Sequence, residues 1–495
     1  MIHYTKISQL LVIAVAVLCS CSQADDIAVK DSNEAAKEGN VVFRLQSNSS
    51  NVTRSAEDSY VHVQGSADEY KVNVARVYLF DNTTKLFVKS VPLANITRKG
   101  SDADGNVIYE TDPISVAQGI YDIFVTANTY RQIKTDSEER FLADIDSVSY
   151  TRALIEDISG GIVMTNRAAD NEATTISESI NENDVTVVDV KLERVLARLD
   201  IAKALENYEL TDANGTKYAS VQLKGYYIVN LPKYYYSFRH TAVLTSIAEP
   251  RWNIQANFGN VADVNGYVID PYFFKKTIDA STFTNADKYY ENYFGDITNP
   301  EAVKWNAFNA ASQTPNYKTA YSLENCSLAP AQKNGYSTGV VFKAVMEPAD
   351  NVYYLDNSGA LQLLTGKQNY PEVLYYYQYK FYNSAEALAA ALTASGAAAS
   401  SSSQGQKFEK TDEGYCCYYN YWIRHLDNNR PTQMGVMEFG IVRNNLYRMV
   451  IANISDLGDG AMPIEPDTPD EGETRLKVEL NVKPWIVRDL TNIVL

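Results

Sequence analysis

The 495-residue sequence contains few histidines, few cysteines and a minority of basic side chains. Its four histidines lie far apart, so no two of them could bind one metal ion from the same helix. Lys and Arg together number 44, Asp and Glu number 61, and the formal net charge is -17. A surface of that sign does not attract phosphate groups. The composition therefore predicts neither a bound metal nor a nucleic-acid partner.

Motifs that carry catalytic chemistry are also missing. The sequence has no GxxxxGK[ST] phosphate loop, no GxSxG turn and no HExxH zinc pair. The segment 102–110 (DADGNVIYE) has its glycine fourth, whereas a calcium-binding EF-hand loop needs it sixth, so we expect a hairpin turn there. We therefore expect a protein that is not an enzyme, with no catalytic residue and no cofactor.

Three cysteines lie beyond the amino-terminal region, at Cys326, Cys416 and Cys417. So few thiols cannot form the disulfide framework that stabilises many small exported domains. Cys416 and Cys417 are adjacent in a strand-like stretch, and adjacent side chains of a strand point to opposite faces. We expect all three to be buried structural thiols and not metal ligands or nucleophiles.

The amino terminus lacks a run long enough to cross a bilayer, because the apolar stretch 10–18 (LLVIAVAVL) has only nine residues. Preceded by Lys6, this stretch has the form of a signal-peptide core. It ends in LCSC, residues 18–21, which resembles the lipobox at which a lipoprotein signal is removed. Cys21 would then carry the lipid that anchors the precursor. The alternative is an ordinary secretory signal with two incidental cysteines.

Alternation of apolar and polar residues dominates the rest of the chain. After a polar tether at 22–40, Val41, Phe43 and Leu45 alternate with more polar neighbours, which is typical of a strand with one buried face. A polar stretch, 47–59, follows and contains Arg54. Further strands are expected at 70–74, 86–88, 121–128, 161–165, 185–192 and 476–482. Turn signals separate most of them, so the pattern predicts a mainly β fold built from β-sandwiches.

Two further features stand out in the second half of the chain. One helix is expected from Ser384, a suitable N-cap, to Gly396. The 36 tyrosines include clusters at 233–240, 287–294 and 375–383. Tyrosine is a favoured strand residue, so a structural role is expected, although exposed rings could also stack on sugars.

The carboxyl terminus joins a strand to an apolar tail. Pro484 interrupts the alternation of 476–482, and residues 485–495 (WIVRDLTNIVL) follow. Soluble proteins seldom end on bare apolar residues unless the end is tied down. The tail therefore either pairs within its own fold or belongs in another molecule.

Residues 415–451 (YCCYYNYWIRHLDNNRPTQMGVMEFGIVRNNLYRMVI), followed by ISDLG and by KPWIVRD in the tail, resemble the C-terminal domain of the fimbrillins. Fimbrillins are shaft subunits of the type V pili of Bacteroidales, and the chain is most similar to the major subunit of the short (minor) fimbria. The resemblance implies two transthyretin-like β-sandwich domains, of which the C-terminal one is larger and carries short helical insertions. It also implies export as a lipoprotein to the outer surface and cleavage by an Arg-specific protease. The cut removes the first strand, and the C-terminal strand of a neighbouring subunit fills the groove.

Carried onto this sequence, the resemblance implies cleavage after Arg54, with Ser55 as the new first residue. Arg44 is a rival site, but it lies inside the strand pattern, where a protease does not readily reach the backbone. The strand to be removed is the one that carries Val41, Phe43 and Leu45. The incoming donor strand would offer five apolar side chains to the groove: Trp485, Val487, Leu490, Ile493 and Leu495.

The expected organisation has five segments: a signal peptide with lipobox at 1–21, a propeptide with tether and removable strand at 22–54, an N-terminal β-sandwich domain at 55–192, a C-terminal β-sandwich domain at 193–483 and a donor strand at 484–495. The expected function is that of a shaft subunit of a surface fimbria that supports adhesion and colonisation. Its partners would be further copies of itself, anchor and tip subunits, the protease and, through the lipid, the outer membrane. The alternatives are an anchor or tip subunit of the same pilus and a monomeric glycan-binding surface lipoprotein.

Overall fold

The computed structural model describes the following residues: 37–47, 66–102, 106–147, 155, 157–166, 173–241, 268–271, 293–294, 303–312, 314–326, 332–396, 405–425, 434–435, 437–461, 465, 468–470 and 475–484. Every helix and strand among them belongs to one compact unit that begins at Glu38. Within the described ranges, no helix has the length and apolar character needed to cross a membrane.

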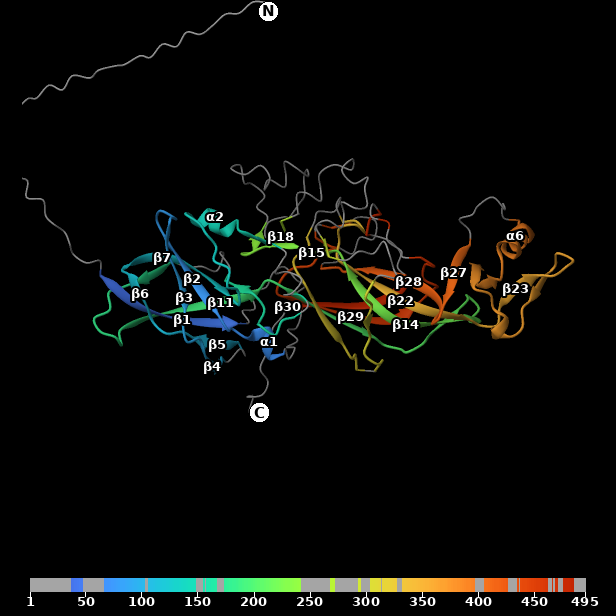
Figure 1. Cartoon of the computed structure of the whole chain (residues 1–495), viewed down its shortest axis with the longest axis horizontal. Helices are drawn as coiled ribbons and strands as arrows, with labels where there is room; N and C mark the ends of the chain where they lie inside the picture. The colour runs from blue at the N-terminus through green and yellow to red at the C-terminus, as the bar shows by residue number, and fades with distance from the viewer. Residues whose placement is uncertain are drawn as a thin grey trace, which may run out of the picture. The chain divides into compact units, whose positions relative to one another are not determined.

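A ten-stranded sheet forms the first β domain (Figure 1). Its main path follows the order β3-β2-β7-β9-β11-β1-β5-β4, with β10 beside β7 and β6 beside β1. Its strands are β1 (Glu38–Ser47), β2 (Ala75–Asp81), β3 (Phe87–Leu93), β4 (Thr97–Ser101), β5 (Val107–Glu110), β6 (Ile114–Ala117), β7 (Gly119–Ala127), β9 (Met164–Thr165), β10 (Thr174–Ile176) and β11 (Val185–Arg194).

This sheet curls around one apolar core. Val77 of β2 and Val125 of β7 pack in the same cluster as Phe43 of β1 and Val190 of β11, and all four side chains are buried. Alternation in the sequence gives each of these strands one apolar face, and the curl of the sheet removes that face from water. The strands predicted around 41–45, 121–128 and 185–192 are therefore confirmed.

The second β domain consists of two sheets that pack face to face. A four-stranded sheet has the order β21-β12-β29-β30, and its strands are β12 (Ala197–Lys203), β21 (Lys318–Ser322), β29 (Asn445–Ile454) and β30 (Leu476–Pro484). A ten-stranded sheet has the order β13-β14-β22-β28-β27-β25-β26-β23-β24, with β20 beside β14. Its strands are β13 (Tyr208–Thr211), β14 (Lys217–Val229), β20 (Asn306–Ala307), β22 (Gly339–Pro348), β23 (Val352–Leu355), β24 (Leu361–Leu363), β25 (Val373–Tyr377), β26 (Lys380–Tyr382), β27 (Gln406–Thr411) and β28 (Gly414–Trp422).

Buried side chains of both sheets share the core of this second domain. Leu199 and Met449 come from the four-stranded sheet, while Leu223 and Phe342 come from the ten-stranded one. Three two-stranded sheets complete the described strands: β8 (Ile145–Ser147) with β16 (Tyr234–Tyr236), β15 (Leu231–Pro232) with β19 (Tyr293–Phe294), and β17 (His240–Thr241) with β18 (Val268–Ile269).

The described helices are short: α1 (Ala67–Tyr70), α2 (Glu138–Leu142), the 3₁₀ helix η6 (Lys367–Asn369) and α6 (Ala385–Ala394). α6 contacts β23, β25, β24 and β26. Ser384 caps it, since its Oγ accepts a hydrogen bond from the N–H of Ala387 at 3.1 Å. The helix predicted to begin at Ser384 is therefore confirmed, and its last residue, Ala394, lies two positions before Gly396.

The predicted mainly β fold in two β domains, with short helices in the second, is confirmed. The antiparallel pairing of β4 with β5, which begins at the pair Ser101–Val107, agrees with the hairpin predicted at 102–110. Residues 103–105, at its tip, lie outside the described residues. One strand prediction is wrong: Tyr70 ends helix α1, and the strand that follows begins only at Ala75.

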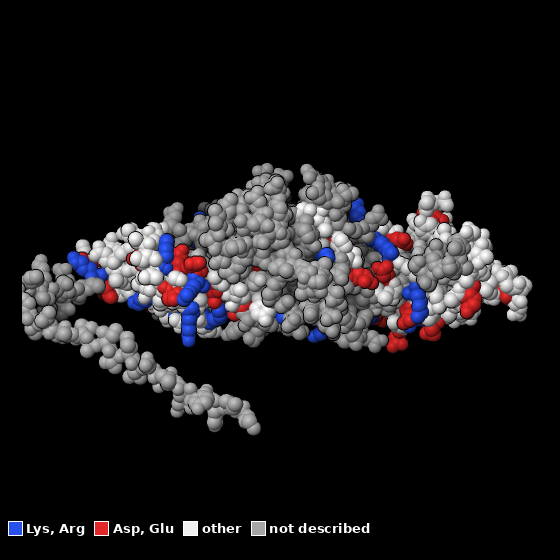
Figure 2. Space-filling view, turned by 90° about the horizontal axis from the view of Figure 1, so that it is seen from above, with Lys and Arg blue, Asp and Glu red and all other residues white. Residues whose placement is uncertain are grey.

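On the face drawn in Figure 2, basic and acidic side chains are interspersed over the described surface.

Candidate functional site: strand β1 and the clasp beside it

Strand β1 lies inside the first sheet, not at its edge (Figure 1). On one side it runs parallel to β11, from the pair Asn40–Val185 to the pair Ser47–Leu192. On the other side its first half pairs antiparallel with β6 and its second half pairs antiparallel with β5. Removal of β1 would therefore leave the backbone edges of β11, β5 and β6 without their partner.

The inward face of β1 is apolar and fully covered. Val41, Phe43 and Leu45 each have 0 % of their surface exposed. At Gly39 an added Cβ would lie 2.1 Å from the carbonyl oxygen of Ser177, so only glycine fits there. The three side chains predicted for the removable strand thus fill the middle of the first core.

The outward face of β1 makes one ion pair. Arg44 Nη1 lies 3.5 Å from Asp189 Oδ1, and the two side chains are 40 % and 52 % exposed. An ion pair that water reaches so freely contributes only about 0–1 kcal/mol. The apolar face of β1, and not its charge, therefore holds the strand in the sheet.

The end of β1 meets the chain again at residues 66–70. We call these residues, which comprise the N-cap Ser66 and helix α1, the α1 clasp. Ser47 Oγ donates a hydrogen bond to the carbonyl oxygen of Tyr70 at 2.8 Å. The two residues that flank 48–65 in the described structure, Ser47 and Ser66, therefore lie at the same part of the fold.

Glu69 fastens the α1 clasp to the second domain. Its side chain is almost fully buried, at 1 % exposure. Arg198 Nη1 lies 3.0 Å from both carboxylate oxygens, and the hydroxyl of Tyr321 donates to Oε1 at 2.8 Å. The backbone N–H of Ser66 donates to Oε2 at 3.1 Å, and Arg194 Nε donates to the backbone carbonyl oxygen of Glu69 at 2.6 Å.

Arg198 connects Glu69 to further charged side chains of the four-stranded sheet through ion pairs. Asp200, which is fully buried, accepts a hydrogen bond from Arg198 Nε at 2.8 Å and lies 3.4 Å from Arg448 Nε. Burial lowers the pKa of Arg194 to about 10, so this guanidinium stays charged at neutral pH. Burial and then the Glu69 carboxylate raise the pKa of Tyr321, which keeps its hydroxyl protonated as the donor.

The α1 clasp is not among the features predicted from the sequence. The sequence does carry a signal for it, because Ser66 and Glu69 have the Ser-x-x-Glu spacing of a helix capping box. The apolar alternation from Tyr70 to Val74 predicts a strand at the same place. The partner arginines could not be paired with Glu69 from the sequence, since Arg198 follows it by 129 residues.

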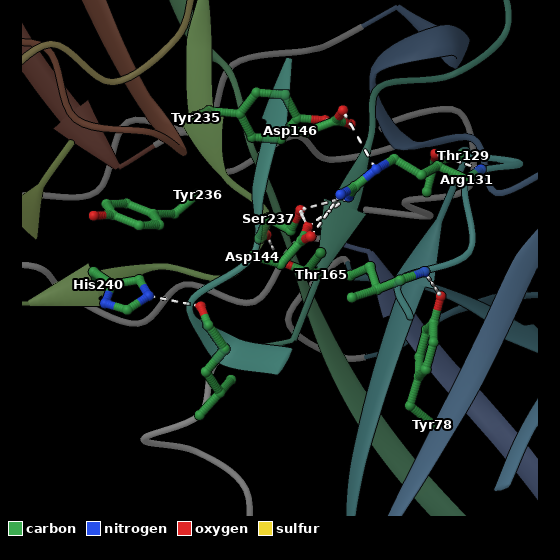
Figure 3. Close-up of polar contacts among 12 residues, drawn as sticks. Tyr78, Thr129, Arg131, Asp144, Asp146, Thr165, Tyr235, Tyr236, Ser237 and His240 are labelled. Carbon is green, nitrogen blue, oxygen red and sulfur yellow. Dashed lines mark hydrogen bonds and ion pairs between the residues drawn. The ribbon is translucent and has the colours of Figure 1, made fainter. Parts of the chain in front are cut away.

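A second set of contacts joins the two domains at the β8–β16 sheet (Figure 3). The guanidinium of Arg131 donates to both carboxylate oxygens of Asp144, and Asp144 also accepts from the hydroxyl of Ser237. The hydroxyl of Tyr235 donates to Asp146 at 2.9 Å. The hydrogen bonds and the negative charge of Asp144 raise the pKa of Arg131, so it remains charged.

Arg443 and Arg239 extend this junction on the side of the second domain. Arg443 Nη2 lies 2.7 Å from Glu324 Oε2, and both side chains are at most 1 % exposed. The same nitrogen donates to the carbonyl oxygen of Tyr236 at 2.7 Å. Arg239 Nη2 lies 2.8 Å from Glu193 Oε2 at the end of β11. Four buried or nearly buried charges therefore hold the residues around β16 between the two domains.

The predicted sites fall into two groups. Val41, Phe43 and Leu45 are brought together on one strand, as described above. The predicted lipidation, cleavage and donor residues lie outside the described residues, and they are Cys21, Arg54, Ser55, Trp485, Val487, Leu490, Ile493 and Leu495.

The cysteine prediction is confirmed for its structural part: Cys326, Cys416 and Cys417 are buried as thiols, not as disulfides. Burial raises the pKa of the Cys417 thiol to about 12, which keeps it unreactive. Within the described residues, no group of three or more His, Cys, Asp and Glu side chains could hold a metal ion.

The described tyrosine clusters are largely packed against the protein. Tyr235 and Tyr236 are buried at the junction. The hydroxyls of Tyr218 and Tyr376 both reach Oδ1 of Asp456, at 2.7 and 3.3 Å. Residues 287–292 of the second predicted cluster lie outside the described residues. For the described clusters, these contacts favour the structural role that we expected.

Two protein-family models match the chain, one in each β domain. The model of the major fimbrial subunit protein FimA matches residues 40–194, which include β1. The model of the fimbrillin C-terminal region, described as major fimbrial subunit protein type IV, matches residues 412–491. The chain belongs to the fimbrillin family. The resemblance to the fimbrillins that was stated from the sequence is thereby confirmed, while the similarity to the major subunit of the short fimbria stays a prediction.

Solved structures of fimbrial proteins are similar to this fimbrillin at low identity. A fimbrillin (FimA) of Porphyromonas gingivalis W83 has 16 % identity and a TM-score of 0.42, over 92 % of this chain and 99 % of that one. The tip fimbrial protein Mfa3 of Porphyromonas gingivalis has 11 % identity and a TM-score of 0.39, over 90 % and 100 %. A fimbrial assembly protein of Parabacteroides distasonis has 12 % identity and a TM-score of 0.25, over 66 % and 98 %. These values are too low to transfer a function from any of the three. A search of curated proteins finds no match to the chain.

Proposed function

We propose that this fimbrillin is a structural shaft subunit of a surface fimbria, of the short-fimbria type. It is exported as a lipoprotein through Cys21 and is cut after Arg54, so that Ser55 becomes the first residue. Strand β1 then leaves the first sheet, and residues 485–495 of the next subunit take its place. The filament supports adhesion and colonisation at the cell surface.

The observation that carries this proposal is the position of β1. The strand nearest the amino terminus fills the centre of the first core with Val41, Phe43 and Leu45, although it precedes the proposed cut. A strand at an edge could be lost with little consequence. A strand between β11 and β5 leaves an apolar groove with two unpaired backbone edges, which is a template for strand addition.

The energetics explain why a cut would be needed before exchange. A resident strand tethered by a short linker has an effective concentration in the millimolar range, so a free strand of similar quality cannot compete with it. Burial of the five apolar donor side chains could contribute roughly 7–15 kcal/mol of favourable transfer free energy. Ordering about 11 residues costs a comparable amount, so the ladder hydrogen bonds help to decide the balance.

The proposed assembly defines the partners. A contact between the tail of one subunit and the groove of the next does not close on itself, and therefore generates a filament. Other copies of the chain are the main partner, with anchor and tip subunits at the two ends. An Arg-specific protease and the outer membrane act on the precursor.

The amino-terminal sequence of the protein sheared from cells tests the cut. A start at Ser55 agrees with a matured shaft subunit. A blocked, lipid-bearing start at Cys21 contradicts it and favours an anchor subunit or a monomeric lipoprotein. Arg54→Ala should leave an uncut, membrane-associated precursor, whereas the matched variant Arg44→Ala, at the rival site, should mature normally.

Deletion of residues 485–495 tests the donor. A shaft subunit without its tail should be exported, cut and soluble, and it should form no filaments. Its urea-unfolding midpoint, compared with that of the intact chain, reports whether the deletion has damaged the subunit itself. Normal filaments made from the deleted chain would show that the tail is not the donor.

A further inference from the structure

We infer that cleavage does not itself release β1: the cut propeptide stays in the first domain as a separately bound peptide, held through residues 38–47, until another strand displaces it. The ligand is therefore a named segment of this chain, and the site is the groove between β11 and β5. The inference rests on the proposed function, because it assumes a cut between Ser47 and Ser66.

The contacts of β1 do not depend on the peptide bonds that the cut would remove. Its pairing with β11 runs over residues 40–47, and its pairing with β6 and β5 covers residues 38–41 and 44–47. Every one of these partners lies beyond residue 106. Val41, Phe43 and Leu45 likewise pack in a cluster whose other members all follow the proposed cut. Cutting between 48 and 65 removes none of these interactions.

The chain on the other side of the cut is held in place independently. Glu69 is bound by Arg198 and Tyr321 of the second domain, and its backbone carbonyl accepts from Arg194 at the end of β11, so residues that follow the cut hold the α1 clasp on both domains. The clasp therefore cannot move away when its covalent link to β1 is cut. The carbonyl of Tyr70 stays where Ser47 Oγ reaches it.

Loss of β1 would expose apolar surface and unpaired backbone groups of the first domain, and both are costly to expose. The apolar groove that Phe43 fills would face water, and the backbone edges of β11 and β5 would lose their partners at the same time. An incoming strand can replace each of these contacts as it enters. Displacement by a partner therefore costs less than spontaneous release, and this makes the cut a step that permits exchange without causing it.

After the cut, β1 is part of a separate peptide and must bind in the groove without the help of a covalent tether. A short flexible linker supplies an effective concentration in the millimolar range, and a purified protein is commonly used at micromolar concentration. The peptide then remains in place only if its dissociation constant is below the micromolar range. Such an affinity, about 8 kcal/mol or more, is the threshold that the experiment has to detect.

The experiment uses the full-length precursor, purified in detergent. Residues 51–57 are replaced by the recognition sequence of a site-specific protease, so that one defined bond is cut. After cleavage, the protein is passed over a size-exclusion column, and each fraction is analysed on a denaturing gel. We expect the propeptide and the large fragment to elute together. Elution of the propeptide in a separate peak directly after cutting would overturn the inference.

A matched pair of variants assigns the retention to the buried face of β1. Phe43→Ala, in the cut protein, should weaken retention of the propeptide by about a hundredfold or more. Arg44→Ala, one position along and on the exposed face, should leave retention unchanged. If Phe43→Ala does not fold, Phe43→Leu should weaken retention of the propeptide by a smaller factor. Equal retention in the Phe43 and Arg44 variants would contradict a bound strand.

A second step separates this inference from the proposed function. A synthetic peptide of residues 485–495 is added in excess to the cut complex. Release of the propeptide agrees with both. Retention of the propeptide against the added peptide counts against the donor assignment but leaves the bound propeptide established. Release on cutting alone refutes the inference, and filament formation can then still be tested by itself.

Discussion

The substitution Phe43→Ala should destabilise the precursor and leave the stability of the filament unchanged. Phe43 is fully buried in the first core, and truncation of a buried phenylalanine to alanine typically lowers the free energy of unfolding by 3–5 kcal/mol. β1 is paired with a neighbouring strand on each side. The cavity that the missing ring leaves therefore cannot be closed by the movement of an edge strand. We therefore expect the precursor to lose about 3–5 kcal/mol.

In the filament, residue 43 has left the subunit according to the proposed function. The stability of the polymer should therefore not depend on the side chain at that position. Urea unfolding of the purified, uncut precursor gives the first quantity. The temperature at which filaments dissociate into subunits gives the second. The expected result is a lower urea midpoint for the precursor and an unchanged dissociation temperature for the filament.

Two controls make the comparison decisive. Arg44→Ala changes the same strand at its exposed ion pair and should shift the stability of the precursor by no more than about 1 kcal/mol. Phe43→Leu keeps most of the volume and ensures that enough precursor folds to assemble. A filament whose dissociation temperature falls with the Phe43 substitution would mean that β1 remains in the mature subunit. The reasoning on strand exchange would then be wrong.

Three further predictions concern the buried charges of the second domain. Glu324→Gln removes the carboxylate that pairs with the buried Arg443 guanidinium, so the urea midpoint should fall by the equivalent of about 3–5 kcal/mol; an unchanged midpoint would contradict the pairing. Burial raises the pKa of Asp470 to about 8, against about 4 in the unfolded chain, so its contribution to stability is present at low pH and is lost as the pH rises from about 4 to about 8. Asp470→Asn, which retains a polar group near Ser337, should remove that loss when urea midpoints are measured across the range, and equal slopes for both proteins would refute it. Burial and then a neighbouring positive charge lower the pKa of His425 to about 4, so stability should fall as the pH drops from about 6.5 to about 4, and His425→Gln should flatten the curve in that interval.

Strand β1 of this fimbrillin could be predicted from the sequence because it has one buried face. Val41, Phe43 and Leu45 alternate with partly exposed neighbours, and period-2 alternation has no other common structural solution. The helix at Ser384 was equally predictable, since an N-cap preceded a run of strong helix formers. Both features depend on residues within ten positions of one another.

The α1 clasp could not be predicted with its partners, because its contacts join residues far apart in the sequence. Glu69 meets Arg198 across 129 residues, and Arg194 meets Asn444 across 250. The sequence around a charged residue in a polar stretch does not show whether its side chain is buried or exposed to solvent. Tyr70 was assigned to a strand for a related reason: its apolar ring alternates with Val72, but the capping pattern that precedes it dominates locally.

The distribution of buried charge in the first domain suits a strand that has to leave. Within the described residues of β1, the one ion pair, Arg44 with Asp189, is exposed to water on both sides. The buried ion pairs, such as Glu69 with Arg198, join residues that all follow the proposed cut. Breaking a buried pair by removing one partner typically costs 3–5 kcal/mol, because the other charge is left without compensation. Removal of β1 leaves no such charge behind. The groove then presents apolar surface, backbone hydrogen-bonding groups and the hydroxyls of Thr111 and Ser179, which accept from backbone N–H groups of β1. A strand of suitable pattern offers apolar side chains and backbone N–H groups to all of these, as the proposed exchange with a tail of different sequence requires.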